Sequence, residues 1–480
     1  MVTTILKLPA LASAAYRKAS TYIAEMMISP IPNIRDNGRL LYIIFPAMIF
    51  GPIKAYHRTA PTIKSRLDKF NHFHWQQLFQ DITRREVRDN PTPPNHHDAS
   101  QNDTIRRQIA KAKGNGDFSR VIKLVKTGGS PPAHPNDTLI SIKAKSPQAG
   151  DKTFPNRPES TTRPPLSPAH IPPTVKPHQI SSKDLKKIIY RKASNTASPG
   201  PNGEQFRHVQ IFTNADPKCL EALKLLVNDQ LANRNIPNYL RELIIVTLGF
   251  GTSKPNGDTR PTGLPQTLDK ITGTCATYIE KKNIKAHNES STTPTENPYG
   301  KTQYGVNSPN GCLLAAKAIQ STLRADPNNA AAKFDAINAY NTTDRTQTKK
   351  GYCQTEVLQP NIPYYNFKNA NKSTILVPHP NFPNNVAELD CTVGSRQGEV
   401  RGAHDYAIAK KLAVKILKQE FPNLTIVSII DDLGVAGNHK ELVCASIRWG
   451  ELLEEYLGTS SNISKNTFVC HNDISIDQPI

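Results

Sequence analysis

Two adjacent aspartates, Asp431 and Asp432, follow an apolar run in the stretch TIVSIIDDLGVAG (425–437). Neighbouring carboxylates repel each other, and the half-buried run before them makes their desolvation costly unless a cation compensates the charge. These residues alone leave two interpretations open. Either the pair lies in solvent at a turn, or it holds a metal ion.

A third aspartate favours the metal interpretation. Asp335 follows Phe334 in the stretch AAKFDAINAYNTTDR (331–345), where we expect a short strand to end. If this strand lies beside the hairpin that turns at Asp431 and Asp432, three carboxylates converge and require divalent cations. The three would then hold two Mg²⁺ ions, with Mn²⁺ as an alternative, and such a pair stabilises the attacking and leaving oxygens of a phosphoryl transfer.

Basic residues on an expected hairpin could hold a triphosphate beside such a site. The stretch TLGFGTSKPNGDTRPTGL (247–264) reads as a strand, a turn and a return strand, with Lys254 and Arg260 flanking the turn. An ammonium and a guanidinium can grip phosphate oxygens by charge and by fork geometry. A surface hairpin with solvated basic residues is the alternative for this segment taken alone.

Two further segments could complete the site. A turn at Gln397-Gly398, with Gly402 after it, leads into an expected helix within residues 394–423. Glycines at the start of a helix let the backbone come close to a ligand. Lys465 would reach a leaving pyrophosphate if the strand that follows it returns to the same sheet.

Six short motifs occur in an order that resembles a reverse transcriptase of the non-LTR retrotransposon type found in protists and algae. They are GPNG (200–203), RPT (260–262), DAINAYN (335–341), QGEVRG (397–402), IDD (430–432) and NISKN (462–466). Each motif is short, but their joint order and spacing are specific over about residues 100 to 470. The resemblance implies an α+β fold with the fingers and palm of a right-hand polymerase and an antiparallel palm sheet.

The resemblance also implies a role for each site residue. Asp335, Asp431 and Asp432 would be the catalytic, metal-binding carboxylates, and the backbone carbonyl of Ala336 would help to hold one ion. Tyr340 would lie under the sugar and exclude a ribose 2′-hydroxyl, which favours deoxynucleotides. The other nucleotide-binding residues would be Lys254 and Arg260 on the triphosphate, Gln397 and Gly398 along the nucleotide and template, and Lys465 at the pyrophosphate.

The sequence departs from the pattern of this family in three places. Ile430 is bulkier than the usual residue before the aspartates, and EVRG (399–402) replaces Asp-Pro-Leu-Gly. Residues 466–480 are too few for the helical thumb that should follow Lys465, so we expect the thumb to be absent. These departures suggest a truncated or degenerate copy of a retroelement.

Composition and pattern divide the chain into three expected regions. Residues 1–126 read as a basic helical region, 127–180 as a proline-rich linker, and 181–480 as a globular region. The resemblance makes this last region the reverse transcriptase domain, with fingers at about 181–329 and palm at about 330–480. In the first region, the aromatics of the segment 66–89 are expected in the core because they recur near helical spacing. The apolar stretch 40–53 is too short to span a bilayer and is expected to be a buried helix.

The net charge and the cysteines of the chain indicate which binding partners and which cellular compartment to expect. A formal net charge of +20 and a pI near 9.5 favour polyanions. The resemblance names them as an RNA template, a DNA primer and deoxynucleoside triphosphates, with no stable membrane association. Seven widely spread cysteines without a CxxC pair indicate reduced thiols in an intracellular protein. The resemblance implies that the protein acts in the nucleus and/or the cytoplasm as a ribonucleoprotein. The oligomeric state stays open.

Two other functions compete with an RNA-directed DNA polymerase. The chain could be a non-catalytic, nucleic-acid-binding relic that keeps the polymerase shape and its positive charge. It could also be an RNA-directed RNA polymerase, which likewise places a carboxylate pair on a hairpin. Tyr340, if it excludes ribose, argues against the RNA polymerase.

Overall fold

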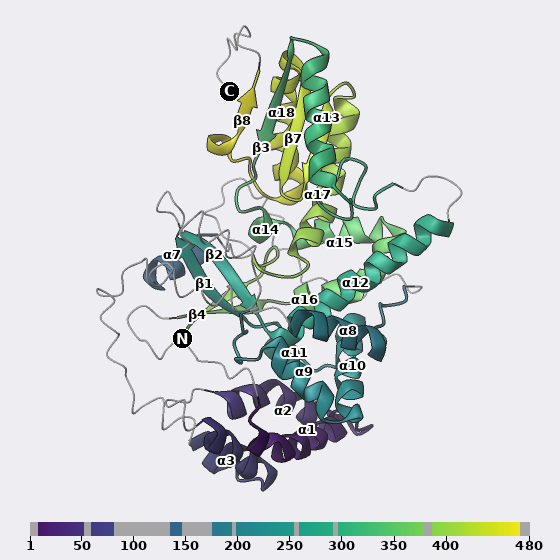
Figure 1. Ribbon diagram of the computed structural model, residues 1–480. Helices are drawn as coiled ribbons and strands as arrows, with labels where there is room; N and C mark the ends of the chain where they lie inside the picture. Colours follow the sequence, from purple (N-terminus) through teal and green to yellow (C-terminus); the bar gives the residue numbers. More distant parts are fainter. Residues whose placement is uncertain are drawn as a thin grey trace.

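The structure is a computed structural model that describes residues 8–51, 59–80, 135–145, 175–193, 198–253, 259–290, 296–378 and 386–470. These residues form a mixed helical and sheet fold. Figure 1 shows a helical part at one end, a small sheet at its side, and a second sheet covered by helices at the other end.

The helical part combines the N-terminal helices with helices that follow the proline-rich segment. They are α1 (Ser13–Met27), α2 (Pro32–Phe50), α3 (Thr59–Asn71), α8 (Ser182–Ala193), α9 (Phe206–Ala215), α10 (Pro217–Ala232), α11 (Asn238–Ile245), α12 (Thr267–Ser290) and α16 (Ile362–Asn369). One hydrophobic cluster runs through them, from Ile23 in α1 to Leu226 in α10 and Phe367 in α16. The described N-terminal helices therefore share their core with the segment that the sequence assigns to the fingers.

Local sequence explains how α10 begins and ends. The Asp216 carboxylate accepts from the backbone N–H of Lys218, and Pro217 occupies the first helical position, where no N–H is needed. Asn233 ends the helix in the left-handed conformation with φ of 51°. Within the helix, Asp229 forms a buried ion pair with Arg39 of α2, which ties the N-terminal helices to α10.

The apolar stretch 40–53 is a buried helix as far as it is described. Residues 40–50 belong to α2, where Tyr42, Phe45 and Ile49 are buried. No helix in the described ranges is both long and apolar enough for a membrane span.

The expectation that all aromatics of the segment 66–89 lie in the core is wrong. Phe70 is buried, but Phe73 is 57% and Phe79 46% exposed. The helix α3 ends at Asn71, Phe73 lies in the turn that follows with φ of 60°, and Phe79 lies on an exposed face of the next helical residues, 75–80. Residues 81–126, the rest of the expected helical region, lie outside the described residues.

The hairpin sheet has the strand order β2-β1-β4-β5. Its strands are β1 (Thr247–Ser253), β2 (Thr259–Pro265), β4 (Ser373–Pro378) and β5 (Val386–Cys391). The strands β1 and β2 form the expected antiparallel hairpin, while β4 pairs with β1 in parallel. The two strands β4 and β5 therefore join this sheet although they fall in the range 330–480 that was expected to be palm.

A helix of the proline-rich region covers one side of the hairpin. Residues 135–145 were expected to be linker but form α7 (Pro135–Lys145). Ser141 Oγ donates to the carbonyl of Thr259 at 2.9 Å, and Ile142 packs with Ile375 and Val377. The linker interpretation is thus wrong for these residues, because their apolar side chains find a partner in the sheet. The remaining residues of 127–174 lie outside the described ranges.

The carboxylate sheet has the strand order β6-β7-β3-β8 and is antiparallel throughout. Its strands are β3 (Asn329–Phe334), β6 (Thr425–Ile429), β7 (Asp432–Asn438) and β8 (Thr467–Val469). It packs against α13 (Gly311–Ala325), α17 (Gly402–Glu420) and α18 (His439–Leu452). The helices α14 (Ala339–Thr342) and α15 (Arg345–Cys353) lie next to α17, below the sheet in Figure 1. Leu417, Leu433, Val435 and Trp449 are among the residues of its core.

Candidate active site

The hairpin between β6 and β7 presents the aspartate pair. Ile429 pairs with Asp432, which leaves Ile430 and Asp431 as a two-residue turn. Ile430 has φ of 56°, an unusual conformation for a β-branched residue. Its backbone N–H donates to Gln303 Oε1 at 3.2 Å, and a Cβ on Gly305 would lie 2.7 Å from its side chain. Gln303 and Gly305 therefore hold this strained turn in place. The bulk of Ile430 does not prevent the turn from forming.

The strand register brings Asp335 to the same end of the sheet. Phe334 pairs with Leu433 in the antiparallel pair of β3 and β7, so the next residues, Asp335 and Asp432, are neighbours where the strands end. The prediction that the strand before Asp335 lies beside the Asp431–Asp432 hairpin is confirmed. Burial and the negative charges of Asp432 and Asp335 raise the pKa of Asp431. The three carboxylates thus form one electrostatic unit.

Lysines compensate two of these carboxylates. Lys465 Nζ lies 3.1 Å from Asp335 Oδ2, and Asn462 Nδ2 donates to the same oxygen at 3.3 Å. Lys333 Nζ lies 3.0 Å from Asp432 Oδ1. Both lysine side chains are more than half exposed, at 53% for Lys333 and 61% for Lys465, so solvent screens these pairs and they are weak.

The carboxylates do not gather as a ligand set in this arrangement. Among the described residues, no three His, Cys, Asp or Glu side chains lie close enough together to hold a metal ion. The donor chemistry nevertheless fits Mg²⁺, because carboxylate oxygens are its preferred protein ligands and the compensating lysines can turn away into solvent. The metal-binding role of the three aspartates stays a prediction.

Lys465 is held near Asp335 by the strand that follows it. The strand β8 returns to β3 and pairs with it, with Lys333 opposite Thr467. The turn before it is fixed on Asp335, whose carbonyl accepts from Asn462 N–H at 2.8 Å and whose own N–H donates to Asn466 Oδ1 at 3.1 Å. We expected Lys465 to reach the site if the strand after it returned to the same sheet, and β8 does return to it.

A buried lysine below the carboxylates was missed in the sequence. Lys410 of α17 is 1% exposed, and its Nζ donates to the carbonyl oxygen of Asp432 at 3.1 Å. Burial lowers the pKa of Lys410 to about 7, against the opposing pull of Asp431 and Asp432. The sequence did contain a signal for its burial. Lys410 lies at a position of α17 that continues the apolar positions Ala407 and Val414.

Tyr340 lies against the same helix. Its ring centroid is 5.6 Å from that of Tyr406 in α17, and a Cβ on Gly402 would lie 3.6 Å from Tyr340 Cδ1. Burial raises the pKa of Tyr340, and the charges of Asp431 and Asp432 raise it further, so the ring lies within the field of the carboxylates. Ala336, between Asp335 and this ring, is nearly buried and forms an isolated bridge with Ser461.

The Gln397-Gly398 turn contacts the hairpin sheet. The N–H of Gly263 in β2 donates to the carbonyl of Gln397 at 2.7 Å. Gly398 has φ of 108°, and a Cβ there would lie 2.2 Å from the carbonyl oxygen of Gly263. Only glycine fits such an approach. Arg260, exposed on the same strand, is thereby linked to the turn, whereas Lys254 lies outside the described residues.

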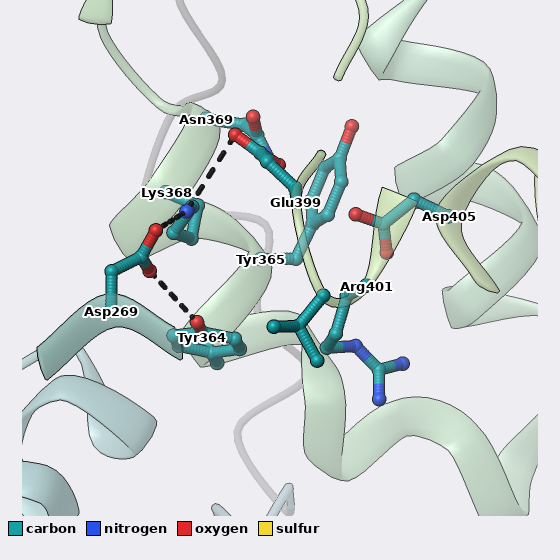
Figure 2. A pocket seen from close by; sticks show the side chains of 9 residues that line it. Asp269, Tyr364, Tyr365, Lys368, Asn369, Glu399, Arg401 and Asp405 are labelled. Carbon is teal, nitrogen blue, oxygen red and sulfur yellow. Dashed lines mark hydrogen bonds and ion pairs between the residues drawn. The ribbon is translucent and has the colours of Figure 1, made fainter. Parts of the chain in front are cut away.

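Buried ion pairs anchor the loop that carries this turn (Figure 2). Lys368 lies between Asp269 and Glu399, and Arg396 pairs with Glu399 as well. Arg401 pairs with Glu280 at 2.7 Å. Burial alone would raise the pKa of Glu399, but the charges of Arg396 and Lys368 lower it to about 2.

The residues that depart from the family pattern are therefore part of this anchor. Glu399 and Arg401 occupy the EVRG segment, and both side chains are almost completely buried with opposite charges beside them. The small cavity in Figure 2, lined by Asp269, Lys368 and Glu399 among others, lies within this network. In place of the family's usual residues, Glu399 and Arg401 thus support the Gln397-Gly398 turn through buried ion pairs.

Comparisons with known proteins add little to this geometry. No protein-family model matches the sequence, and no curated protein matches it significantly. Among solved structures, the chain is similar to apo telomerase from Candida tropicalis, with a TM-score of 0.36 and 11% sequence identity over 48% of this chain. The match spans 44% of that telomerase chain, less than half of its length. A likeness this small does not establish a common fold, and the resemblance to non-LTR reverse transcriptases stays a prediction.

Proposed function

We propose that the chain is an RNA-directed DNA polymerase of a retroelement, which adds deoxynucleotides to a primer 3′-hydroxyl on an RNA template. One observation carries the proposal. Asp335 and the Asp431–Asp432 pair lie far apart in the sequence, yet the register of β3 on β7 brings them to one end of one sheet. Three carboxylates at the end of neighbouring strands are costly unless the site uses them, because like charges at close range repel each other.

In this function Asp335, Asp431 and Asp432 would hold two Mg²⁺ ions, with Mn²⁺ as an alternative. The ions would supply charge stabilisation for the attacking and leaving oxygens. Lys465, now paired with Asp335, would be released toward the leaving pyrophosphate. Lys410 would keep the β6–β7 turn in place from below through its hydrogen bond to the Asp432 carbonyl.

The remaining residues would bind and select the nucleotide. Arg260 of β2, together with Lys254, would hold the triphosphate, and the Gln397-Gly398 turn would line the base pair. Tyr340, backed by Tyr406, would block a ribose 2′-hydroxyl. Alignment of the reactants and fixed electrostatics would then account for catalysis without a covalent intermediate. Such a protein would act in the nucleus and/or the cytoplasm as a ribonucleoprotein.

Primer extension by the full chain tests this proposal. The assay uses an annealed RNA template and DNA primer with Mg²⁺ and either deoxynucleotides or ribonucleotides. We expect extension with deoxynucleotides, and loss of extension in Asp335→Ala. Equal use of ribonucleotides would instead favour an RNA-directed RNA polymerase, and retained extension in Asp335→Ala would remove Asp335 from the metal site.

One observation favours a second function, a non-catalytic nucleic-acid-binding protein. Lys333 and Lys465 already pair with Asp432 and Asp335, so these two carboxylates have counter-charges from the folded chain itself. A chain of this kind would bind RNA equally well with Mg²⁺ and with a chelator, and it would not extend a primer under any condition.

A further inference from the structure

Two helices of the helical part carry a surface rich in lysine, which we call the basic ridge. It consists of Lys183, Lys186 and Lys187 on α8 and Lys281, Lys282 and Lys285 on α12, all exposed. Figure 1 shows α8 beside α12 in the helical part, near the middle of the molecule and apart from the carboxylate sheet. The proposed catalysis gives these lysines no role.

The spacing of α8 explains why its lysines share one face. Leu185, Ile188 and Ile189 turn into the core and are almost completely buried. Lys186 and Lys187 lie three and four residues after Lys183, so the three lysines share the opposite side of the helix. The apolar stripe that docks the helix thus fixes a cationic stripe toward solvent.

Direct contacts join the two helices into one surface. Asp184 Oδ1 accepts from the Tyr278 hydroxyl at 2.8 Å, and Asp184 Oδ2 accepts from Lys282 Nζ at 2.9 Å. The hydrogen bond from Lys282 lowers the pKa of Asp184. On the exposed faces of α8 and α12 the only other carboxylate is Glu289, which pairs with Lys285. Both carboxylates are thus matched by a lysine, and the ridge keeps a net positive charge.

We propose that the basic ridge binds the phosphate backbone of RNA outside the catalytic centre. Lysine ammoniums act as point charges that neutralise phosphates and read no bases, so the contact would be independent of sequence. The choice of RNA rests on the proposed function, which requires an RNA template longer than the part being copied.

The surface does not fit a membrane. Membrane-binding helices pair a basic face with exposed Leu, Phe or Trp side chains that enter the lipid. On α8 the apolar residues are buried, and the large side chain that is partly exposed, Tyr190 at 38%, has Lys186 Nζ 5.7 Å above its ring. A tyrosine beside lysines is instead common where aromatic and basic groups contact nucleic acid.

Charge reversal with a matched control tests the proposal. The ridge variant combines Lys183→Glu, Lys187→Glu and Lys281→Glu. The control combines Lys317→Glu, Lys415→Glu and Lys440→Glu, three exposed lysines on the helices around the carboxylate sheet. Both variants change the net charge equally, so any difference between them reports the location of the charge rather than its total.

Fluorescence anisotropy measures binding to a labelled RNA stem-loop between low and physiological salt, without nucleotides or divalent ions. For the ridge variant we expect affinity to fall by about tenfold or more, and the slope of log affinity against log salt to fall by about one for each lost phosphate contact. The control variant should lose far less. Equal losses in both variants, or no loss in the ridge variant, would overturn the proposal.

Two further probes fix the partner. Because the lysines contact phosphates and read no bases, a DNA duplex of the same sequence should lose about as much affinity as the RNA, and a loss for DNA alone would contradict the assignment to RNA. Vesicles of anionic phospholipid should bind the ridge variant and the control variant alike, and a selective loss in the ridge variant would mark a membrane surface instead. If thermal unfolding shows that charge reversal disturbs the fold, the ridge variant is made instead with glutamine, as Lys183→Gln, Lys187→Gln and Lys281→Gln. Because no primer is extended in these measurements, a failure of the proposed polymerase activity leaves their outcome readable.

Discussion

The carboxylate sheet and the hairpin sheet each have four strands, but different features place their functional residues. In the carboxylate sheet, a core of large apolar side chains such as Leu433 and Trp449 fixes the strands, and the charged groups lie at the strand ends. In the hairpin sheet, backbone approaches fix the geometry. Gly249 leaves room for Ile142 of α7, and Gly263 meets the Gln397-Gly398 turn.

This difference predicts opposite responses to mutation. Removal of a carboxylate from the first sheet should change chemistry and leave the fold intact, because the charges repel each other and do not hold the strands. Addition of a single methyl group to the second sheet should displace backbone, because close-packed interiors do not absorb it. The predictions below test this contrast from the largest expected effect to the smallest.

Asp431→Asn should reduce the rate of primer extension by about a thousandfold, because a metal-binding charge at the reacting centre is lost. Its thermal unfolding temperature should rise slightly, since the substitution removes a carboxylate whose pKa is raised by burial and by Asp432 and Asp335. Single-turnover extension and calorimetry measure the two effects. A variant that is inactive because it is unfolded would refute the contrast between the sheets.

Glu399→Gln should destabilise the protein by about 3 kcal/mol at pH 7, because Arg396 would be left as a buried charge without its carboxylate and Lys368 would keep only Asp269. The pKa of Glu399 in the folded protein is about 2, below its value of about 4.3 in an unfolded chain. Its contribution to stability is therefore fully present above pH 4.3 and is lost as the pH falls through 2. Urea unfolding at several pH values should show the difference between variant and wild type shrinking below about pH 4. A difference that stays constant with pH would show that the loss comes from packing and not from charge.

Gly398→Ala should cost about 2 kcal/mol, because the new Cβ would approach the carbonyl oxygen of Gly263 and the backbone has φ of 108°. Gly203→Ala is the control, since Gly203 also has a positive φ, of 75°, but its Cβ would meet nothing within 4 Å. Urea unfolding of both variants separates close contact from conformational strain. Equal losses would mean that the contact between the turn and the hairpin sheet contributes nothing.

The sequence allowed prediction where local pattern carries the information. The apolar run before Asp431 and the strand before Asp335 predict strand ends with carboxylates, and the turn signal at 255–258 predicts the β1–β2 hairpin. Glycines 394, 398 and 402 mark the loop before α17 in the same way. Each of these signals is carried by residues that are close together in the sequence.

The rest of the arrangement depends on contacts between distant segments. Nothing local to β4 indicates that it pairs in parallel with β1, and nothing local to α7 indicates that Ile142 finds a pocket over Gly249. The lysines that pair with the aspartates could be predicted from the sequence only in part. Lys333 precedes Asp335 by two residues and so shares a face of the strand with it, whereas its contact with Asp432 follows only from the register of β3 on β7.

Lys333→Met should tighten Mn²⁺ binding to the free protein by about two- to fivefold, the smallest effect of the series, because the lysine is exposed and its pair with Asp432 is screened by solvent. Removing the ammonium leaves Asp432 without a competing cation and makes the site more negative. Electron paramagnetic resonance of free Mn²⁺, measured without nucleic acid, gives the affinity directly. Lys301→Met is the control, since Lys301 forms a similarly exposed pair with Glu296, outside the carboxylate sheet. If both substitutions change the affinity equally, the effect reflects overall charge. If Lys333→Met alone changes it, the strand ends bind metal in competition with Lys333, and the charged end of this sheet is distinguished from the surface ion pair of Lys301 and Glu296.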